Sequence, residues 1–85
     1  MGTEVSDDDI EDMSYKVRMS TASSIFITSN SSLEGGDASQ CQKLLAEALR
    51  YLFDVDSDSP KAAQDLKFRI VSCMQKVRMI FDSRV

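Results

Sequence analysis

The stretch LKFRIVSCMQKVRMIF, residues 66–81, has its apolar side chains at the spacing of a long amphipathic helix. These positions follow one another at steps of four, three, four and three residues: Leu66, Ile70, Cys73, Val77 and Ile80. A repeat of about 3.5 residues favours a helix that packs antiparallel to another or in a coiled coil. We therefore predict a helix from Pro60 to about Ser83.

A shorter amphipathic segment, QCQKLLAEALRYLF, precedes it at residues 40–53. Its apolar face is formed by Cys41, Leu45, Ala48 and Leu52. Ser39 followed by Gln42 matches a capping box, in which each side chain satisfies a backbone amide of the first turn, and predicts a helix start at about Gln40. Two such helices joined by a short turn predict an all-α antiparallel hairpin over residues 39–85.

The second helix of this hairpin is about twice as long as the first, so its end, residues 74–81, lacks a partner within the pair. Phe68, Val71 and Met79 also project from its far side, which implies a further packing neighbour. Either residues 15–27 fold back or a second chain completes a four-helix bundle; we expect the second chain, and the two are compatible with each other. The predicted interface residues of this dimer or tetramer are Leu45, Leu52, Leu66, Ile70, Val77, Ile80 and Phe81.

The two cysteines help to predict how the hairpin packs and where in the cell the protein is located. A hairpin that turns near Ser57 sets residues whose numbers sum to about 114 opposite each other, and Cys41 and Cys73 satisfy this condition. They are interpreted as small buried apolar residues in the helix seam, with a redox staple as the alternative. Their number and spacing indicate neither zinc binding nor a disulfide-rich secreted protein, and favour an intracellular location, cytoplasmic or nuclear.

The front of the chain differs in composition. Residues 1–13 are dense in acids and predict a flexible tail, in which Ser6 before three aspartates resembles an acidophilic kinase substrate and predicts a phosphoprotein. Residues 14–29 predict an extended or weak β segment, and residues 30–38 a Ser/Gly linker. Ile25, Phe26 and Ile27 form the core of a candidate peptide motif, within residues 4–30, that could add a strand to a partner's sheet as SUMO-interacting segments do.

The acidic turn FDVDSDSPKAAQD, residues 53–65, resembles the run-in to an EF-hand calcium loop. Counted from Asp54, acids fall at the first, third, fifth and twelfth positions: Asp54, Asp56, Asp58 and Asp65. However, Ser59 replaces the glycine at the sixth position, and Ala62 offers no oxygen at the ninth. We therefore favour a helix start in which Ser59 caps and Pro60 takes the first position, without a metal, and keep a degenerate EF-hand-like calcium-binding helix-loop-helix as the alternative function.

Composition excludes several other functions. The chain has no histidine, which argues against an enzyme, and no motif indicates a cofactor. No apolar run reaches the ~20 residues that cross a bilayer, so no membrane partner is expected. The net charge of -4 makes nucleic acid an unfavourable partner. The sequence therefore predicts a protein-protein interaction module that acts as a scaffold, oligomerisation or docking domain within a larger protein.

Overall fold

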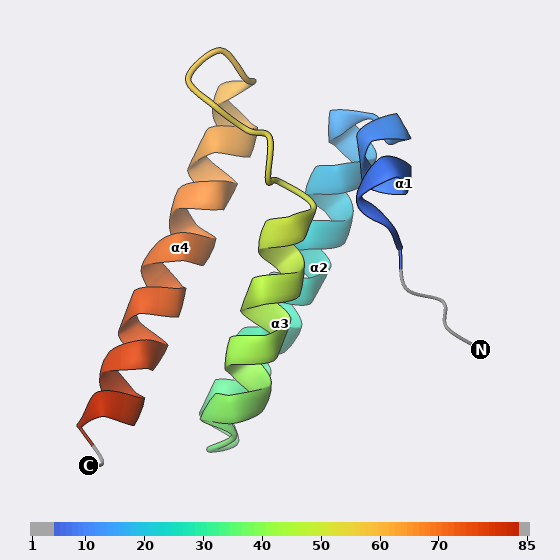
Figure 1. Ribbon diagram of the computed structural model, residues 1–85. Coiled ribbons are helices and arrows are strands. Elements are labelled where there is room, and N and C mark those ends of the chain that lie inside the picture. The colour runs from blue at the N-terminus through green and yellow to red at the C-terminus, as the bar shows by residue number, and fades with distance from the viewer. Residues whose placement is uncertain (1–4, 84–85) are drawn as a thin grey trace.

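A computed structural model describes residues 5–83 of the chain. Its helices are α1 (Asp7–Asp12), α2 (Tyr15–Glu34), α3 (Ala38–Arg50) and α4 (Lys61–Asp82), and the described part contains no strand. α2, α3 and α4 run in alternating directions, and α3 packs against both of the others (Figure 1). The all-α class and the α3–α4 hairpin are confirmed.

The β segment expected at residues 14–29 is wrong, because these residues belong to α2. The Ser14 side chain accepts a hydrogen bond from the Val17 amide and caps the helix at its start. The buried face repeats at steps of four and three residues and includes small side chains: Tyr15, Met19, Ala22, Phe26, Ser29 and Leu33. Ala22 and Ser29 have no exposed surface, so α2 can lie close to α3 and be stabilised by that packing.

The linker expected at residues 30–38 is instead a helix end followed directly by a helix start. The Gly36 amide donates to the Leu33 carbonyl and the Asp37 amide to the Ser32 carbonyl, which is a Schellman turn. Gly36 has a φ of 87°, the left-handed conformation that this turn requires. The Asp37 side chain then caps α3 by accepting from the Gln40 amide at 2.9 Å, so the predicted cap at Ser39 is wrong.

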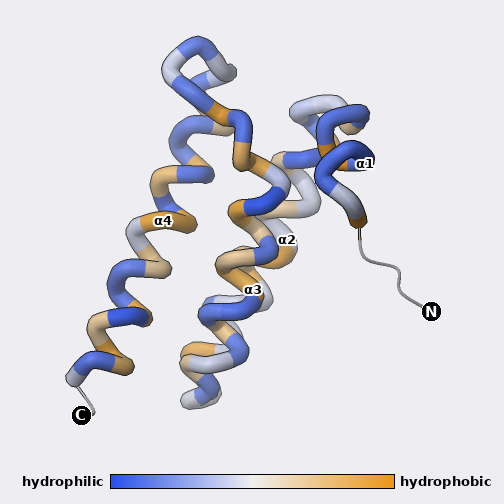
Figure 2. The backbone as a smooth tube through the Cα atoms, viewed as in Figure 1, coloured by the Kyte–Doolittle hydropathy of each residue, from blue (hydrophilic) through white to orange (hydrophobic). Residues whose placement is uncertain are grey.

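Part of the acidic tail is also ordered as α1, whereas residues 1–4 lie outside the described residues. Ser6 and Asp9 form a reciprocal capping box at the start of α1. Ile10 is fully buried in the core, and Met13 packs partly against it. Figure 2 shows the rest of α1 as mostly hydrophilic. The apolar side chain of Ile10 and the hydrogen bonds that Arg18 donates to the Ile10 and Glu11 carbonyls therefore hold this short helix on the bundle.

The core lies between α2, α3 and α4 and includes both cysteine-bearing faces. Its fully buried side chains on α3 and α4 include Cys41, Leu45, Ile70 and Val77. The end of α4 is covered within the chain, because Val77 is fully buried there and Met74 packs against the core. The front segment does fold back: as α2 it packs on α3 and also contacts α4.

Candidate functional site

The outer face of α4, which we define as Phe68, Val71, Ser72, Gln75 and Met79, points away from the core. Phe68 is 72% exposed and Met79 is 69% exposed, the highest fractions among the large apolar side chains of the described residues. Residues 68, 72, 75 and 79 lie on one side of a helix because they are spaced by four, three and four positions. Two large apolar side chains thus stand three turns apart on the same exposed face.

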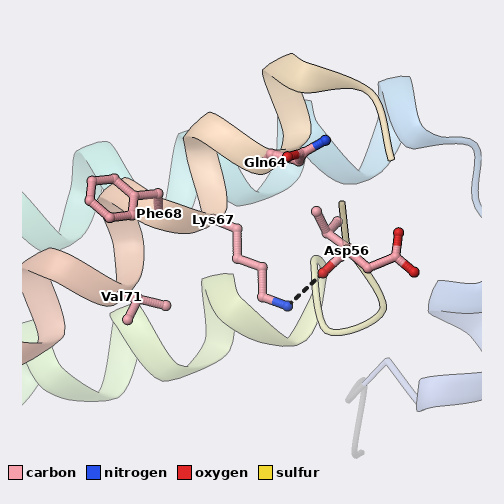
Figure 3. Close-up of a pocket in the computed structure, with 6 residues that line it drawn as sticks. Asp56, Gln64, Lys67, Phe68 and Val71 are labelled. Atoms are coloured by element: carbon pink, nitrogen blue, oxygen red, sulfur yellow. Dashed lines mark hydrogen bonds between the residues drawn. The ribbon is translucent and has the colours of Figure 1, made fainter. Parts of the chain in front are cut away.

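Shallow grooves border this face on both sides. Towards α3 and the loop after it, a groove of about 300 Å³ lies beside Phe68 and Val71 (Figure 3). It continues along α4 as a second hollow that Val71 shares with Leu49 and Met74. Towards α2, another groove of about 300 Å³ runs beside Phe68. Its lining is Phe26, Asn30, Phe68, Arg69, Ser72, Cys73 and Lys76.

Lys67 fixes the loop that forms one wall of the first groove. Its Nζ donates to the Val55 carbonyl at 2.9 Å and to the Phe53 carbonyl at 3.4 Å. Figure 3 shows the Lys67 side chain reaching along the groove to the loop. These carbonyls lie just after the end of α3, where a cation is favourable. These hydrogen bonds from Lys67 therefore hold the loop that forms the groove wall against α4.

The charge of α4 is strongly positive. The helix carries five basic side chains against two acidic ones: Lys61, Lys67, Arg69, Lys76, Arg78, Asp65 and Asp82. None of these basic side chains forms a salt bridge within residues 5–83. Arg69 and Lys76 border the groove towards α2, and Arg78 borders the one towards α3. An acidic ligand would thus find cations on both sides of the apolar anchors.

The predicted interface residues are mostly in the chain's own core. Leu45, Leu52, Ile70 and Val77 have no exposed surface, and Leu66 packs partly against them. Ile80 is half-buried and Phe81 is 37% exposed at the end of α4. The structure therefore separates two faces of α4: the 3.5-residue repeat faces α2 and α3, and the residues that the sequence placed on the far side remain exposed.

The candidate strand-addition motif lies inside α2. Ile25 and Phe26 are half-buried against the core, whereas Ile27 is 63% exposed. The backbone groups of this segment are already paired within the helix. Pairing with a sheet edge would therefore require α2 to unfold.

The four aspartates of the calcium pattern do not gather at one point. Asp54 accepts a hydrogen bond from Arg18 at 2.7 Å, and Asp56 accepts from the Asp58 amide at 2.9 Å within the loop. Asp65 is on the exposed side of α4. Among residues 5–83, no group of three or more His, Cys, Asp or Glu side chains is placed to hold a metal ion.

The helix start predicted after this loop is shifted. α4 begins at Lys61 with Pro60 as its cap residue, and no side chain caps it. The Ser59 hydroxyl instead accepts from the Asp56 amide at 3.0 Å. Gln64 Nε2 donates to the Ser59 carbonyl at 2.6 Å and closes the loop onto the first turn of α4.

The predicted apposition of the two cysteines agrees with the structure. Cys41 is fully buried and has Cys73 and Ser29 as its side-chain neighbours. Both thiols are free. Asn30 was not predicted to lie beside this pair, and its Oδ1 is 3.8 Å from Cys73 Sγ. The heptad spacing of α2 is the signal that would have placed Ser29 and Asn30 beside the hairpin seam.

Within residues 5–83, no helix combines the length and the apolar character that crossing a membrane requires. Comparison of the chain with protein families, with curated proteins and with solved structures finds no match in any of the three.

Proposed function

We propose that this chain is a non-enzymatic protein-protein interaction module whose docking surface is the outer face of α4. The observation that carries the proposal is the exposure of Phe68 and Met79, three turns apart on one helix face with grooves beside them. Large apolar side chains spaced in this way are anchors for a partner helix that lies in a groove.

The proposed occupant is a helical segment of another protein that carries apolar and acidic side chains. Its apolar side chains would pack on Phe68, Val71 and Met79. Its carboxylates would meet Arg69, Lys76 and Arg78, none of which has an ion-pair partner within residues 5–83. Such charge complementarity increases the association rate and selects against basic partners.

Self-association is the competing form of the proposal, as the sequence predicts a dimer or tetramer. The reason for that prediction was the uncovered end of the long helix, whereas Val77 near this end is fully buried within the chain itself. Two copies that packed α4 against α4 would also bring five basic side chains of each copy near those of the other. This repulsion favours an acidic partner over a second copy. An intracellular setting, cytoplasmic or nuclear, remains a prediction from the cysteines.

Two matched peptides test the proposal. Both are amphipathic helices with leucine at positions i, i+4, i+7 and i+11; one has glutamate on the flanks and the other lysine. We expect fluorescence anisotropy to show binding of the acidic peptide alone, and weaker binding as salt is added. Phe68→Gln with Met79→Gln should abolish it, whereas Ile27→Gln, at an exposed position of α2, should not.

Three results would contradict the choice of partner. Equal binding of the two peptides would remove the role of charge, and preferential binding of an oligonucleotide would point to phosphates. A light-scattering mass of two or more chains that falls to one in the Phe68→Gln, Met79→Gln variant would identify a second copy as the occupant.

A further inference from the structure

The thiols of Cys41 and Cys73 come from α3 and α4 and lie beside two consecutive residues of α2. Cys41 has no exposed surface, and Cys73 and Ser29 are the neighbouring side chains that affect the pKa of its thiol. Cys73 is half-buried, and its Sγ lies 3.8 Å from Asn30 Oδ1. Since α3 and α4 pack directly on each other, the two thiols meet across a helix contact.

The two thiols differ in their access to solvent. Cys73 lines the groove between α2 and α4, where Ser72 and Lys76 are also at the surface. This groove of about 300 Å³ admits a small neutral oxidant such as hydrogen peroxide. Cys41 lies behind it in the core. Burial raises the pKa of the Cys41 thiol, and the neighbouring Cys73 raises it further, so Cys41 remains protonated at neutral pH.

We propose that the two cysteines form a peroxide-reactive pair, in which Cys73 is oxidised first and Cys41 then closes a disulfide between α3 and α4. The groove that exposes Cys73 also borders the outer face of α4, but the oxidation needs only the two thiols and no bound partner.

The reaction balances with hydrogen peroxide as the only oxidant. The Cys73 sulfur attacks one peroxide oxygen, the S–O bond forms as the O–O bond breaks, and the second oxygen leaves as water with the thiol proton. The Cys41 sulfur then attacks the sulfur of the Cys73 sulfenic acid. The S–S bond forms as the S–O bond breaks, and the hydroxyl leaves as a second water with the Cys41 proton.

The disulfide would link α3 to α4 and enclose the loop that connects these helices. A bridge between residues 41 and 73 closes a loop of 32 residues and restricts the unfolded chain. We expect the thermal midpoint of the oxidised chain to exceed that of the reduced chain by about 10 °C, and a thiol reductant to reverse the change.

The experiment treats the full chain with hydrogen peroxide under native conditions and follows its intact mass without reductant. We expect a monomer that has lost two hydrogen atoms, and a cross-linked peptide pair containing Cys41 and Cys73 after proteolysis. Cys41→Ser should stop at a Cys73 sulfenic acid that dimedone traps. Cys73→Ser should leave Cys41 unoxidised, because peroxide does not reach it.

Circular dichroism of each variant first establishes that it is folded. A disulfide between Cys73 residues of two chains, oxidation of Cys41 in the Cys73→Ser variant, or a bridge that forms only in denaturant would overturn the proposal. A thermal midpoint that does not rise on oxidation would also count against it, since the two thiols would then not be in position to bridge without strain.

Discussion

Arg18 and Asp54 form an ion pair with an Nη1–Oδ1 distance of 2.7 Å that joins α2 to the loop after α3. The same guanidinium donates from Nε to the Ile10 carbonyl at 2.7 Å and from Nη2 to the Glu11 carbonyl at 2.9 Å. These carbonyls lie near the end of α1; the Ile10 carbonyl also accepts from the Met13 amide at 3.0 Å, so Arg18 is its second donor. Arg18 is only 5% exposed. From this buried position its side chain connects α2, to which it belongs, with α1 and with the loop after α3.

Replacement of Arg18 should therefore destabilise the fold. We expect Arg18→Ala to lower the free energy of unfolding by about 2–4 kcal/mol, because it removes the donor to the Glu11 carbonyl and to the Asp54 carboxylate and one of two donors to the Ile10 carbonyl. Urea denaturation measures this loss. Arg78→Ala, at an exposed position of α4, should change stability by less than about 0.5 kcal/mol. A loss for Arg18→Ala no larger than that of Arg78→Ala would contradict the connecting role.

The hairpin could be predicted from the sequence because its signal is strong and local. In α3 and α4, large aliphatic side chains repeat at helical spacing, and the buried positions Leu45, Ile70 and Val77 are those that the repeat selects. The apposition of Cys41 and Cys73 followed from the position of the turn alone. The residue that caps α3 was predicted wrongly, since Asp37 rather than Ser39 is the N-cap.

α2 was missed because its buried face does not look like a core. It contains an arginine, an alanine and a serine at its fully or nearly fully buried positions: Arg18, Ala22 and Ser29. Hydrophobic periodicity counts such residues as polar or neutral, while the β-branched residues nearby favour a strand. The spacing by four and three from Tyr15 to Leu33 was present, but only the packing against α3 gives small side chains at that spacing a stabilising role.

The same limit applies to the exposed outer face of α4. The sequence correctly placed Phe68 and Met79 on the far side of the long helix, but it could not decide which of the two apolar faces the chain itself covers. That decision depends on α2, and hence on the segment that the sequence assigned to a β peptide. The basic side chains beside the exposed face were visible in the sequence, whereas their lack of ion-pair partners within residues 5–83 required the structure.

Opposite faces of α4 should respond differently to the same substitution. We expect Val77→Asp to unfold the chain, because an unpaired carboxylate at a fully buried position costs several kcal/mol in a domain of marginal stability. Phe68→Asp should stay folded, with a change within about 1 kcal/mol, since Phe68 is 72% exposed. Circular dichroism during thermal unfolding compares the two. Unfolding by Phe68→Asp would mean that the outer face is covered.

Gly35 and Gly36 are adjacent in the turn between α2 and α3, and only Gly36 has a positive φ. Gly36→Ala should destabilise by about 1 kcal/mol, because Gly36 has a φ of 87°, which an L side chain adopts at a cost. Gly35→Ala should be neutral or stabilising by about 0.5 kcal/mol, since Gly35 has a φ of -77° and an added Cβ would meet only ordinary contacts at 3.6 Å. Chemical denaturation of both variants measures the difference. Equal effects would contradict the assigned Schellman turn.

The buried thiol of Cys41 should make stability fall at alkaline pH. Its pKa lies above the ordinary value of 9.0 in the folded chain, because burial and the neighbouring Cys73 both disfavour the thiolate. The folded state therefore binds the proton more tightly than the unfolded state does. The corresponding stability is fully present below pH 9 and is lost as the pH rises through the folded-state pKa, at up to about 1.4 kcal/mol per pH unit.

Cys41→Ala provides the reference for this titration. It loses packing at all pH values, but it has no thiol to ionise at that position and otherwise carries the same titratable groups as the parent chain. We expect urea denaturation in the presence of a phosphine reductant to show a larger loss between pH 8 and pH 10.5 for the parent than for the variant. Parallel losses would show that the Cys41 pKa does not change on folding, and would thereby contradict its burial beside Cys73.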